Sequence, residues 1–190
     1  MILFSAILED ILDYDINQFD VASYNVASKV ISDTITPIAK IITRLGNAET
    51  LIFITIILVV SIKDKKIRFA IPINLLCASV LNFILKNIIQ RPRPNEFRII
   101  DQSGYSFPSG HSMVSMAFYG FLIYLIFKNV KNNYIKALLI FILTCIIIMI
   151  GLSRVYLGVH YTSDVLGGFL LALSYLTLYT AFFKTISNKN

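Results

Sequence analysis

The sequence predicts an all-α protein, an integral membrane helical bundle, and three observations support this prediction. Hydrophobic residues make up 56% of the 190 residues, whereas charged residues make up 15%. The apolar residues form long blocks, and a membrane span needs roughly 20 mainly apolar residues. Too little polar surface remains between the blocks to solvate a water-soluble bundle. We expect five transmembrane helices, at residues 47–63, 67–89, 113–127, 134–152 and 165–183.

The segment before residue 47 has a different pattern. Apolar residues recur at helical spacing from Tyr24 to Leu45 with polar residues between them, so this segment is too polar to face lipid on every side. We expect one domain, in which residues 1–46 form an amphipathic helical segment at the membrane interface and residues 47–190 form the transmembrane core. A sixth spanning helix within residues 20–45 is the open alternative. A cleavable signal peptide is not expected, because a basic region at the amino end is missing.

The charged residues are distributed unevenly between the two predicted membrane faces. Short loops rich in Lys and Arg stay in the cytoplasm, and the loops at residues 63–68 and 128–136 are of this kind. The opposite face receives the acidic amino-terminal segment and the motifs described below, so we expect it to point outward in the cell membrane. The net charge of +6 is not accompanied by a stripe of aromatic residues, and we expect no nucleic-acid partner.

The first motif places two cations at the end of the second predicted span. Pro92 and Pro94 are expected to stop this helix near Gln90. Lys86 then lies one turn inside the helix and Arg93 lies in the following loop, where both can converge on one anion. The competing interpretation is that Lys86 extends to the interface and that Arg91, Arg93 and Arg98 contact lipid headgroups.

The second motif, Pro-Ser-Gly-His at residues 108–111, precedes the third predicted span. Pro and Ser suit the start of a helix, and Gly lets a ligand approach the backbone. Free N–H groups at a helix start bind phosphate, so Ser109 and Gly110 are candidate phosphate ligands and His111 lies beside them. A simple cap followed by a turn is the alternative.

The third motif combines Arg154 with a histidine and a carboxylate. If the fifth span begins near His160, then His160 and Asp164 lie four residues apart on one helical face. The carboxylate can accept the proton of one imidazole nitrogen, which leaves the other nitrogen unprotonated as a nucleophile. A structural His–Asp pair is the alternative.

Taken together, the three motifs resemble the type 2 phosphatidic acid phosphatase superfamily. The pattern is Lys, six residues and Arg-Pro; then Pro-Ser-Gly-His; then Ser-Arg, five residues, His, three residues and Asp. It is complete between Lys86 and Asp164, and the surrounding spans look like the membrane-embedded bacterial branch. The resemblance implies that His160 becomes a phosphohistidine, that Asp164 orients it, and that His111 protonates the leaving oxygen. It also implies a set of phosphate ligands: Lys86, Arg93, Arg154, Ser109 and Gly110.

The resemblance therefore implies a metal-independent lipid phosphatase without a cofactor, acting on a lipid phosphate or diphosphate such as phosphatidylglycerophosphate or undecaprenyl diphosphate. A phosphotransferase of the same fold that passes the phosphoryl group to another lipid is the first alternative. A vanadate haloperoxidase would be soluble, which the apolar blocks argue against, and a transporter would not need two histidines at these spacings. The sequence leaves the particular lipid, the acceptor and the oligomeric state open.

Overall fold

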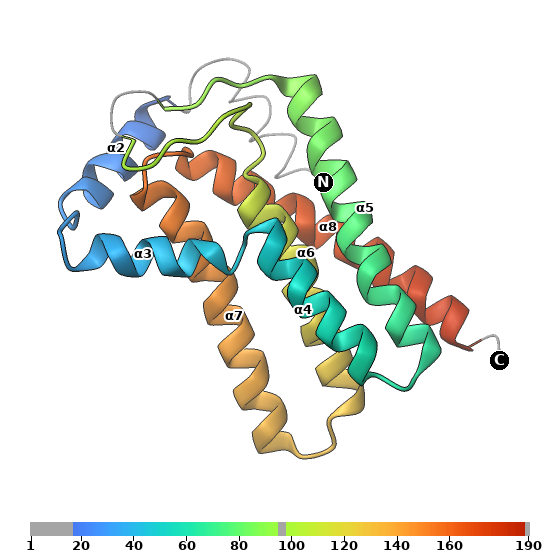
Figure 1. Cartoon of the computed structure of the whole chain (residues 1–190). Helices are drawn as coiled ribbons and strands as arrows, with labels where there is room; N and C mark the ends of the chain where they lie inside the picture. The colour runs from blue at the N-terminus through green and yellow to red at the C-terminus, as the bar shows by residue number, and fades with distance from the viewer. Residues whose placement is uncertain (1–16, 95–97, 189–190) are drawn as a thin grey trace.

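The computed structural model describes residues 17–94 and 98–188. Within these residues all regular secondary structure is helical, which confirms the all-α prediction (Figure 1). The helices in chain order are α2 (Asn17–Ser28), α3 (Ile35–Arg44), α4 (Ala48–Ser61), α5 (Lys65–Ile89), α6 (Gly110–Asn129), α7 (Asn133–Tyr156) and α8 (Thr162–Asn188).

The helices α5, α6, α7 and α8 are each long and apolar enough to cross a membrane. Helix α4 has only 14 residues, which is about 21 Å at 1.5 Å per residue, against a hydrocarbon thickness of about 30 Å. It passes the same test only together with α3, and the two helices are bent by 50° at the break between them. The described residues therefore hold four helices that span on their own, and the predicted five spans are reached when this bent pair counts as one.

The predicted alternative of a sixth span is not seen in the described part of residues 20–45. This part holds two shorter helices, α2 and α3, joined by residues 29–34. Polar groups of this connection and of the start of α3 bind α7, since the Ser32 N–H and the Thr36 hydroxyl both lie within hydrogen-bond distance of the Tyr156 hydroxyl, at 3.2 and 2.9 Å. The amino-terminal helices therefore lie over one end of the bundle.

The ends of the spanning helices follow from their capping residues. The Asp64 side chain accepts hydrogen bonds from the N–H groups of Lys66 and Ile67 and so starts α5. Helix α5 ends at Ile89, as expected, because Gln90 adopts a left-handed conformation with φ of 53° and prolines follow. The Ser109 side chain caps the start of α6 by accepting from the Ser112 N–H.

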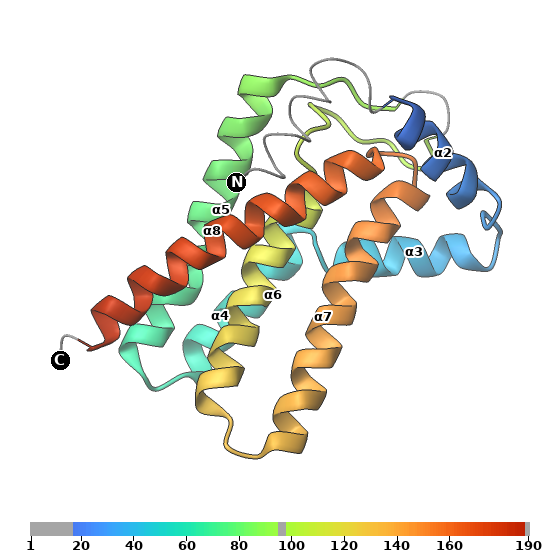
Figure 2. The ribbon, with the colours of Figure 1, turned by 180° about the vertical axis from the view of Figure 1, so that it is seen from behind.

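Helix α6 lies at the centre of the bundle and packs against α5, α7 and α8 (Figure 2). Its buried face includes Phe118 and Phe121, which are almost completely enclosed by the neighbouring helices. Polar groups also join the helices, since Tyr175 and Tyr179 of α8 donate to backbone oxygens of α5 at 3.1 and 2.6 Å. Such interhelical hydrogen bonds are typical of helices packed in a membrane.

A glycine pair fixes how closely α8 approaches the start of α6. A Cβ at Gly168 would lie 3.2 Å from the Ser109 carbonyl oxygen and 3.3 Å from the Met113 nitrogen, and a Cβ at Gly167 would lie 2.4 Å from the Phe107 ring. Only glycine allows this approach without a shift of backbone or ring. The approach also lets the Ser109 N–H donate to the Asp164 carbonyl oxygen at 3.1 Å, so the second and third motifs are held together.

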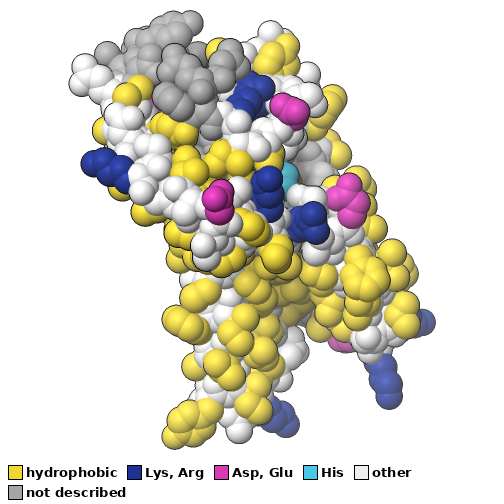
Figure 3. All heavy atoms as spheres, turned by 60° about the vertical axis from the view of Figure 1, so that its left-hand side comes forward, with side chains coloured by type: hydrophobic (Ala, Val, Ile, Leu, Met, Phe, Trp, Pro, Cys, Tyr) yellow, Lys and Arg dark blue, Asp and Glu magenta, His cyan; other side chains and the backbone are white. Residues whose placement is uncertain are grey.

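All three motifs lie at one end of the bundle. The carboxyl ends of α5 and α7 meet the amino ends of α6 and α8 there, beside α2, whereas the α4–α5 and α6–α7 loops lie at the opposite end (Figure 1). The space-filling view shows charged side chains at the two ends and hydrophobic side chains over the stretch between them (Figure 3). This is the arrangement of a multi-pass membrane protein, with its basic loops and its motifs on opposite sides.

Candidate active site

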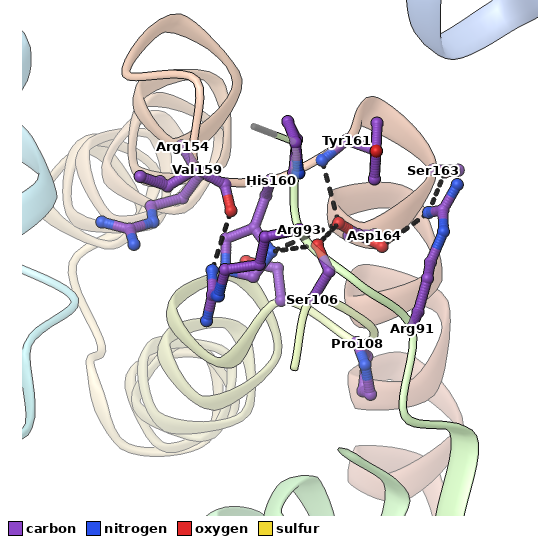
Figure 4. A network of polar contacts seen from close by, with 12 residues as sticks. Arg91, Arg93, Ser106, Pro108, Arg154, Val159, His160, Tyr161, Ser163 and Asp164 are labelled. Carbon is purple, nitrogen blue, oxygen red and sulfur yellow. Dashed lines mark hydrogen bonds and ion pairs between the residues drawn. The ribbon is translucent and has the colours of Figure 1, made fainter. Parts of the chain in front are cut away.

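The two residues predicted to form a His–Asp pair do so in the structure. His160 lies in the turn between α7 and α8 with 2% of its surface exposed, and its Nδ1 is 3.3 Å from Asp164 Oδ2 (Figure 4). The other ring nitrogen, Nε2, is 3.0 Å from Arg93 Nη1. A guanidinium can only donate, so Nε2 must accept, and the hydrogen bonds therefore assign the ring proton to Nδ1.

The position of His160 keeps the ring uncharged. Burial, with a smaller contribution from nearby Arg93, lowers the pKa of His160 to about 3, although the contact with Asp164 opposes this shift. A lowered pKa means that the neutral ring is the stable form at every pH above that value. A neutral ring with an unprotonated Nε2 is the form of histidine that can act as a nucleophile, once the electron pair that Nε2 shares with Arg93 turns to a phosphate.

Asp164 is fully buried and is held by contacts from several directions. It is the third residue of α8, and its Oδ2 accepts from the N–H of Tyr161, the residue before the helix, at 2.8 Å. This is the backward contact of a capping box, so the local sequence holds one oxygen of the carboxylate, Oδ2, at the start of the helix. The Ser106 hydroxyl also donates to Oδ2, and Arg91 Nη1 lies 2.7 Å from Oδ1 (Figure 4).

Arg93 and Lys86 hold the segment between α5 and α6 in place by hydrogen bonds to its backbone. Arg93 is buried and donates to the carbonyl oxygens of Gly104 and Val159 at 2.9 and 2.8 Å. Burial lowers the pKa of Arg93 to about 10, so the guanidinium stays charged at neutral pH. Lys86 Nζ donates to the carbonyl oxygens of Tyr105 and Ser106 at 2.6 and 3.3 Å. The two cations of the first motif are therefore brought beside the third motif.

Arg154 is the most deeply buried cation of the site, with 1% of its surface exposed. Its Nη1 donates to Thr43 Oγ1 at 2.8 Å and its Nη2 donates to Gln102 Oε1 at 3.0 Å. Its Nε makes no hydrogen bond to any described residue. A buried N–H without a partner is unfavourable, and an anion that accepts from it would remove this cost.

The second motif starts α6 at the same end. His111 Nε2 lies 2.8 Å from Asn47 Oδ1, at the break between α3 and α4. The Ser109 hydroxyl is fully buried and is 3.0 Å from the Ser112 hydroxyl, so it already has an internal partner. Gly110 lies beside Asn82, whose Oδ1 would be 3.1 Å from a Cβ at this position. The role of Ser109 and Gly110 as phosphate ligands stays a prediction.

Sequence reasoning missed several residues that complete the site. Arg91 was assigned to lipid headgroups in the competing interpretation, but it binds Asp164 in the interior. Arg91 and Arg93 are each followed by proline. This repeat of Arg-Pro could have indicated that Arg91 also belongs to the site. Asp20, Asn47 and Thr43 lie far from the motifs in the chain, and no local pattern marks them.

The fold and the arrangement of the motifs define a class of protein, and comparison with known proteins identifies it. Residues 69–187, more than half of the chain, match the family model described as the PAP2 superfamily, so the chain belongs to this superfamily. The structure is also similar to the crystal structure of a transmembrane PAP2 type phosphatidylglycerolphosphate phosphatase from Bacillus subtilis. That similarity has a TM-score of 0.90 and 28% sequence identity, and it covers 100% of this chain and 96% of the other.

Similar proteins of known activity are lipid phosphatases. Phosphatidylglycerophosphatase B of Bacillus subtilis is 39% identical over 108 residues, which are 56% of this chain and 53% of that protein. Undecaprenyl-diphosphatase of Sulfolobus acidocaldarius is 26% identical over 153 residues, 76% of this chain and 70% of that protein. The first match spans about half the length of its relative. The crystal structure of Aquifex aeolicus LpxE shares the fold, with a TM-score of 0.69 and 21% sequence identity. The similarity covers 85% of this chain and 94% of the other.

Proposed function

We propose that this protein is an integral membrane phosphatase that removes the terminal phosphate from a lipid phosphate or diphosphate. The observation that carries the proposal is the buried His160–Asp164 pair with Arg93 beside Nε2, at one end of a membrane bundle. Arg154, with an unpartnered Nε, and Lys86 supply further positive charge. Phosphoryl transfer depends mostly on positioning and on charge stabilisation, and fixed cations provide both.

The proposed reaction has two steps. In the first, His160 Nε2 attacks phosphorus, so that a P–N bond forms while the P–O bond to the lipid breaks and His111 gives a proton to the departing oxygen. In the second, water attacks the phosphohistidine, a P–O bond forms, the P–N bond breaks, and His111 takes up the proton of the water. Asp164 holds the Nδ1 proton throughout and stabilises the charge that develops on the ring.

The proposed substrate has a hydrocarbon chain that lies beside His111. A groove of about 580 Å³ runs between α4, α5 and α6, with Gly110 and His111 at one end and mostly apolar residues, such as Leu51, along its length. Its size suits one chain, and the apolar wall gives no further selectivity. The named relatives act on phosphatidylglycerophosphate and undecaprenyl diphosphate, by their names. We propose these two lipids as the first candidates.

The experiment that tests the function is phosphate release from a panel of lipid phosphates by the purified protein in detergent. The panel contains phosphatidylglycerophosphate, undecaprenyl diphosphate and phosphatidic acid. The proposal expects release from at least one lipid and none by the His160→Ala variant. If phosphate moves onto a second lipid and no free phosphate appears, the protein is a phosphotransferase. If no lipid loses phosphate, the proposed function is wrong.

Activity is expected to need no divalent metal. The three cations Lys86, Arg93 and Arg154 would occupy the role that magnesium has in kinases. Asp164 is committed to contacts with His160 and Arg91, so it is a poor magnesium ligand. Activity assayed in excess chelator should equal activity in magnesium. A loss in chelator that magnesium restores would contradict this prediction.

The His111→Ala variant is expected to lose about 10²–10⁴-fold in lipid hydrolysis, the usual contribution of a general acid. Nitrophenyl phosphate should recover much of this loss, because its leaving group needs little protonation. The ratio of the two rates, measured in the wild type and in the variant, checks the assignment. An equal loss for both substrates would show that His111 does not protonate the leaving oxygen.

The site is proposed to lie on the outer face of the cell membrane, with residues 1–46 at the interface and residues 47–190 forming the catalytic core. Ser103 and Lys131 are both exposed: Ser103 lies in the segment that leads from α5 to the motif end of α6, and Lys131 lies in the loop after the other end of α6. In a variant without Cys77 and Cys145, an impermeant thiol reagent should label Ser103→Cys in intact cells and should not label Lys131→Cys. The reverse labelling pattern would place the site inside the cell.

A further inference from the structure

We infer that Asp20 and Arg91 are positioning residues for the nucleophile, and that they act on His160 through Asp164. The inference rests on the proposed function of His160. Neither residue belongs to the three motifs, and they come from different parts of the chain: Asp20 lies in α2 and Arg91 lies in the segment after α5. Together they connect the amino-terminal helix to the carboxylate that binds the histidine ring.

Arg91 uses its guanidinium to join two carboxylates. Its Nη1 lies 2.7 Å from Asp164 Oδ1 and 2.8 Å from the Ser163 hydroxyl, and its Nη2 lies 2.8 Å from Asp20 Oδ2. The guanidinium carbon is 4.2 Å from the centre of the Tyr161 ring, which covers one face of the group. With only 13% of its side chain exposed, Arg91 is oriented toward the interior and not toward a phosphate (Figure 4).

Asp20 is buried, with 2% of its surface exposed, and its side-chain hydrogen bonds to described residues lead to the start of α8 and to Arg91. Its Oδ1 accepts from the Ser163 N–H at 3.0 Å, and its Oδ2 accepts from the Ser163 hydroxyl at 2.7 Å and from Arg91. Asp20 therefore caps α8 from another helix, because it satisfies an N–H group that the start of α8 leaves without a partner. A buried carboxylate is tolerated only with such partners.

The two oxygens of Asp164 have different partners, and this difference explains how Arg91 and Asp20 act on the site. Its Oδ1 accepts from Arg91, while its Oδ2 accepts from Ser106, from the Tyr161 N–H and from the His160 ring. Arg91 therefore fixes the rotation of the carboxylate, and Asp20 fixes Arg91. Without either of them, Asp164 can turn, and the Nδ1 proton of His160 loses its acceptor in the correct place. Arg93, two residues from Arg91, faces Nε2 instead, so the two arginines have different roles.

A purely structural role is the competing explanation, in which Asp20 and Arg91 only attach α2 to the bundle. The two explanations differ in what happens when Asp164 no longer carries a carboxylate. A positioning residue that acts through Asp164 has no further effect in an Asp164→Asn variant, whereas an independent contribution adds to the loss. A positioning role also predicts a particular kinetic effect. A misplaced nucleophile slows turnover of every substrate, whatever its leaving group.

The test compares Asp20→Asn, Arg91→Lys and the control Asp33→Asn, which changes an exposed acid between α2 and α3. Turnover is measured with nitrophenyl phosphate and with a lipid substrate, together with thermal unfolding in detergent. We expect Asp20→Asn and Arg91→Lys to lower kcat by about 10- to 100-fold, the range found for groups that orient metal-bound histidines. The loss should be equal for both substrates, with KM nearly unchanged, and Asp33→Asn should behave as the wild type.

The decisive comparison repeats Asp20→Asn and Arg91→Lys in the Asp164→Asn background, where we expect no further loss of kcat. A full additional loss in that background, or wild-type kcat in the single variants, overturns the inference. If Asp20→Asn does not fold, Arg91→Lys keeps the charge and decides the matter by the same comparison. Failure of the proposed function is separate, because it would appear in the wild type as the absence of phosphate release.

Discussion

Replacement of His160 by Ala is expected to abolish turnover of every substrate. The ring is neutral, its Nδ1 proton faces Asp164, and its Nε2 is unprotonated because it accepts from Arg93, so Nε2 is the candidate nucleophile. Because the variant has no group to accept the phosphoryl group, a good leaving group cannot restore the rate. The measurement is release of nitrophenol and of phosphate by purified His160→Ala, compared with His111→Ala.

The comparison between the two histidines controls for damage to the fold. Both variants remove an imidazole at the same end of the bundle, but only His111→Ala should recover with nitrophenyl phosphate. Thermal unfolding in detergent should show that both remain folded. If nitrophenyl phosphate restores His160→Ala and does not restore His111→Ala, the two roles are reversed.

The Asp164→Asn variant is expected to lose about 10⁴-fold in kcat, as the analogous change does in a serine-protease triad. The amide can donate to Nδ1, which would place the ring proton on Nε2 and leave the wrong nitrogen free. The structure adds a second reason for the loss. An amide group cannot accept from Arg91 and from Ser106 together as the carboxylate does, so one donor loses its partner.

Single-turnover kinetics with excess protein checks this prediction, since the loss should lie in the formation of the phosphohistidine. Asn82→Ala offers a control, because Asn82 is a buried polar residue of α5 that donates to the Pro108 carbonyl oxygen and does not contact Asp164. A loss below about 10-fold for Asp164→Asn would show that the carboxylate does not set the tautomer of His160.

The spanning helices could be predicted because their signal is local. An uninterrupted apolar block identifies a helix in lipid without knowledge of its neighbours, and α5 to α8 all agree with the predicted blocks. The block before residue 63 differs from the others, since α4 has 14 residues and reaches spanning length only together with the preceding α3, from which it is bent by 50°. The break at Gly46 and Asn47 lies against His111, a long-range contact that the block pattern does not contain.

The contacts of the candidate site are likewise of two kinds: local ones, which the sequence can predict, and long-range ones, which depend on the fold. His160 and Asp164 are four residues apart at a helix start, so their contact follows from helical geometry alone. Arg91 and Asp20 required the fold, because Asp20 reaches the site from 143 residues before Ser163 in the chain. For Ser109 the sequence allowed two roles, a helix cap and a phosphate ligand. In the structure its hydroxyl caps α6.

If His160 carries the phosphoryl group during turnover, the phosphorylated protein can be isolated and its phosphate located. The protein is mixed with a substrate labelled in the transferred phosphate, quenched in alkali, digested and mapped by mass spectrometry. We expect an alkali-stable and acid-labile phosphate on His160, lost in His160→Ala and retained in His111→Ala. Phosphate on any other residue, or label that persists in His160→Ala, would contradict it.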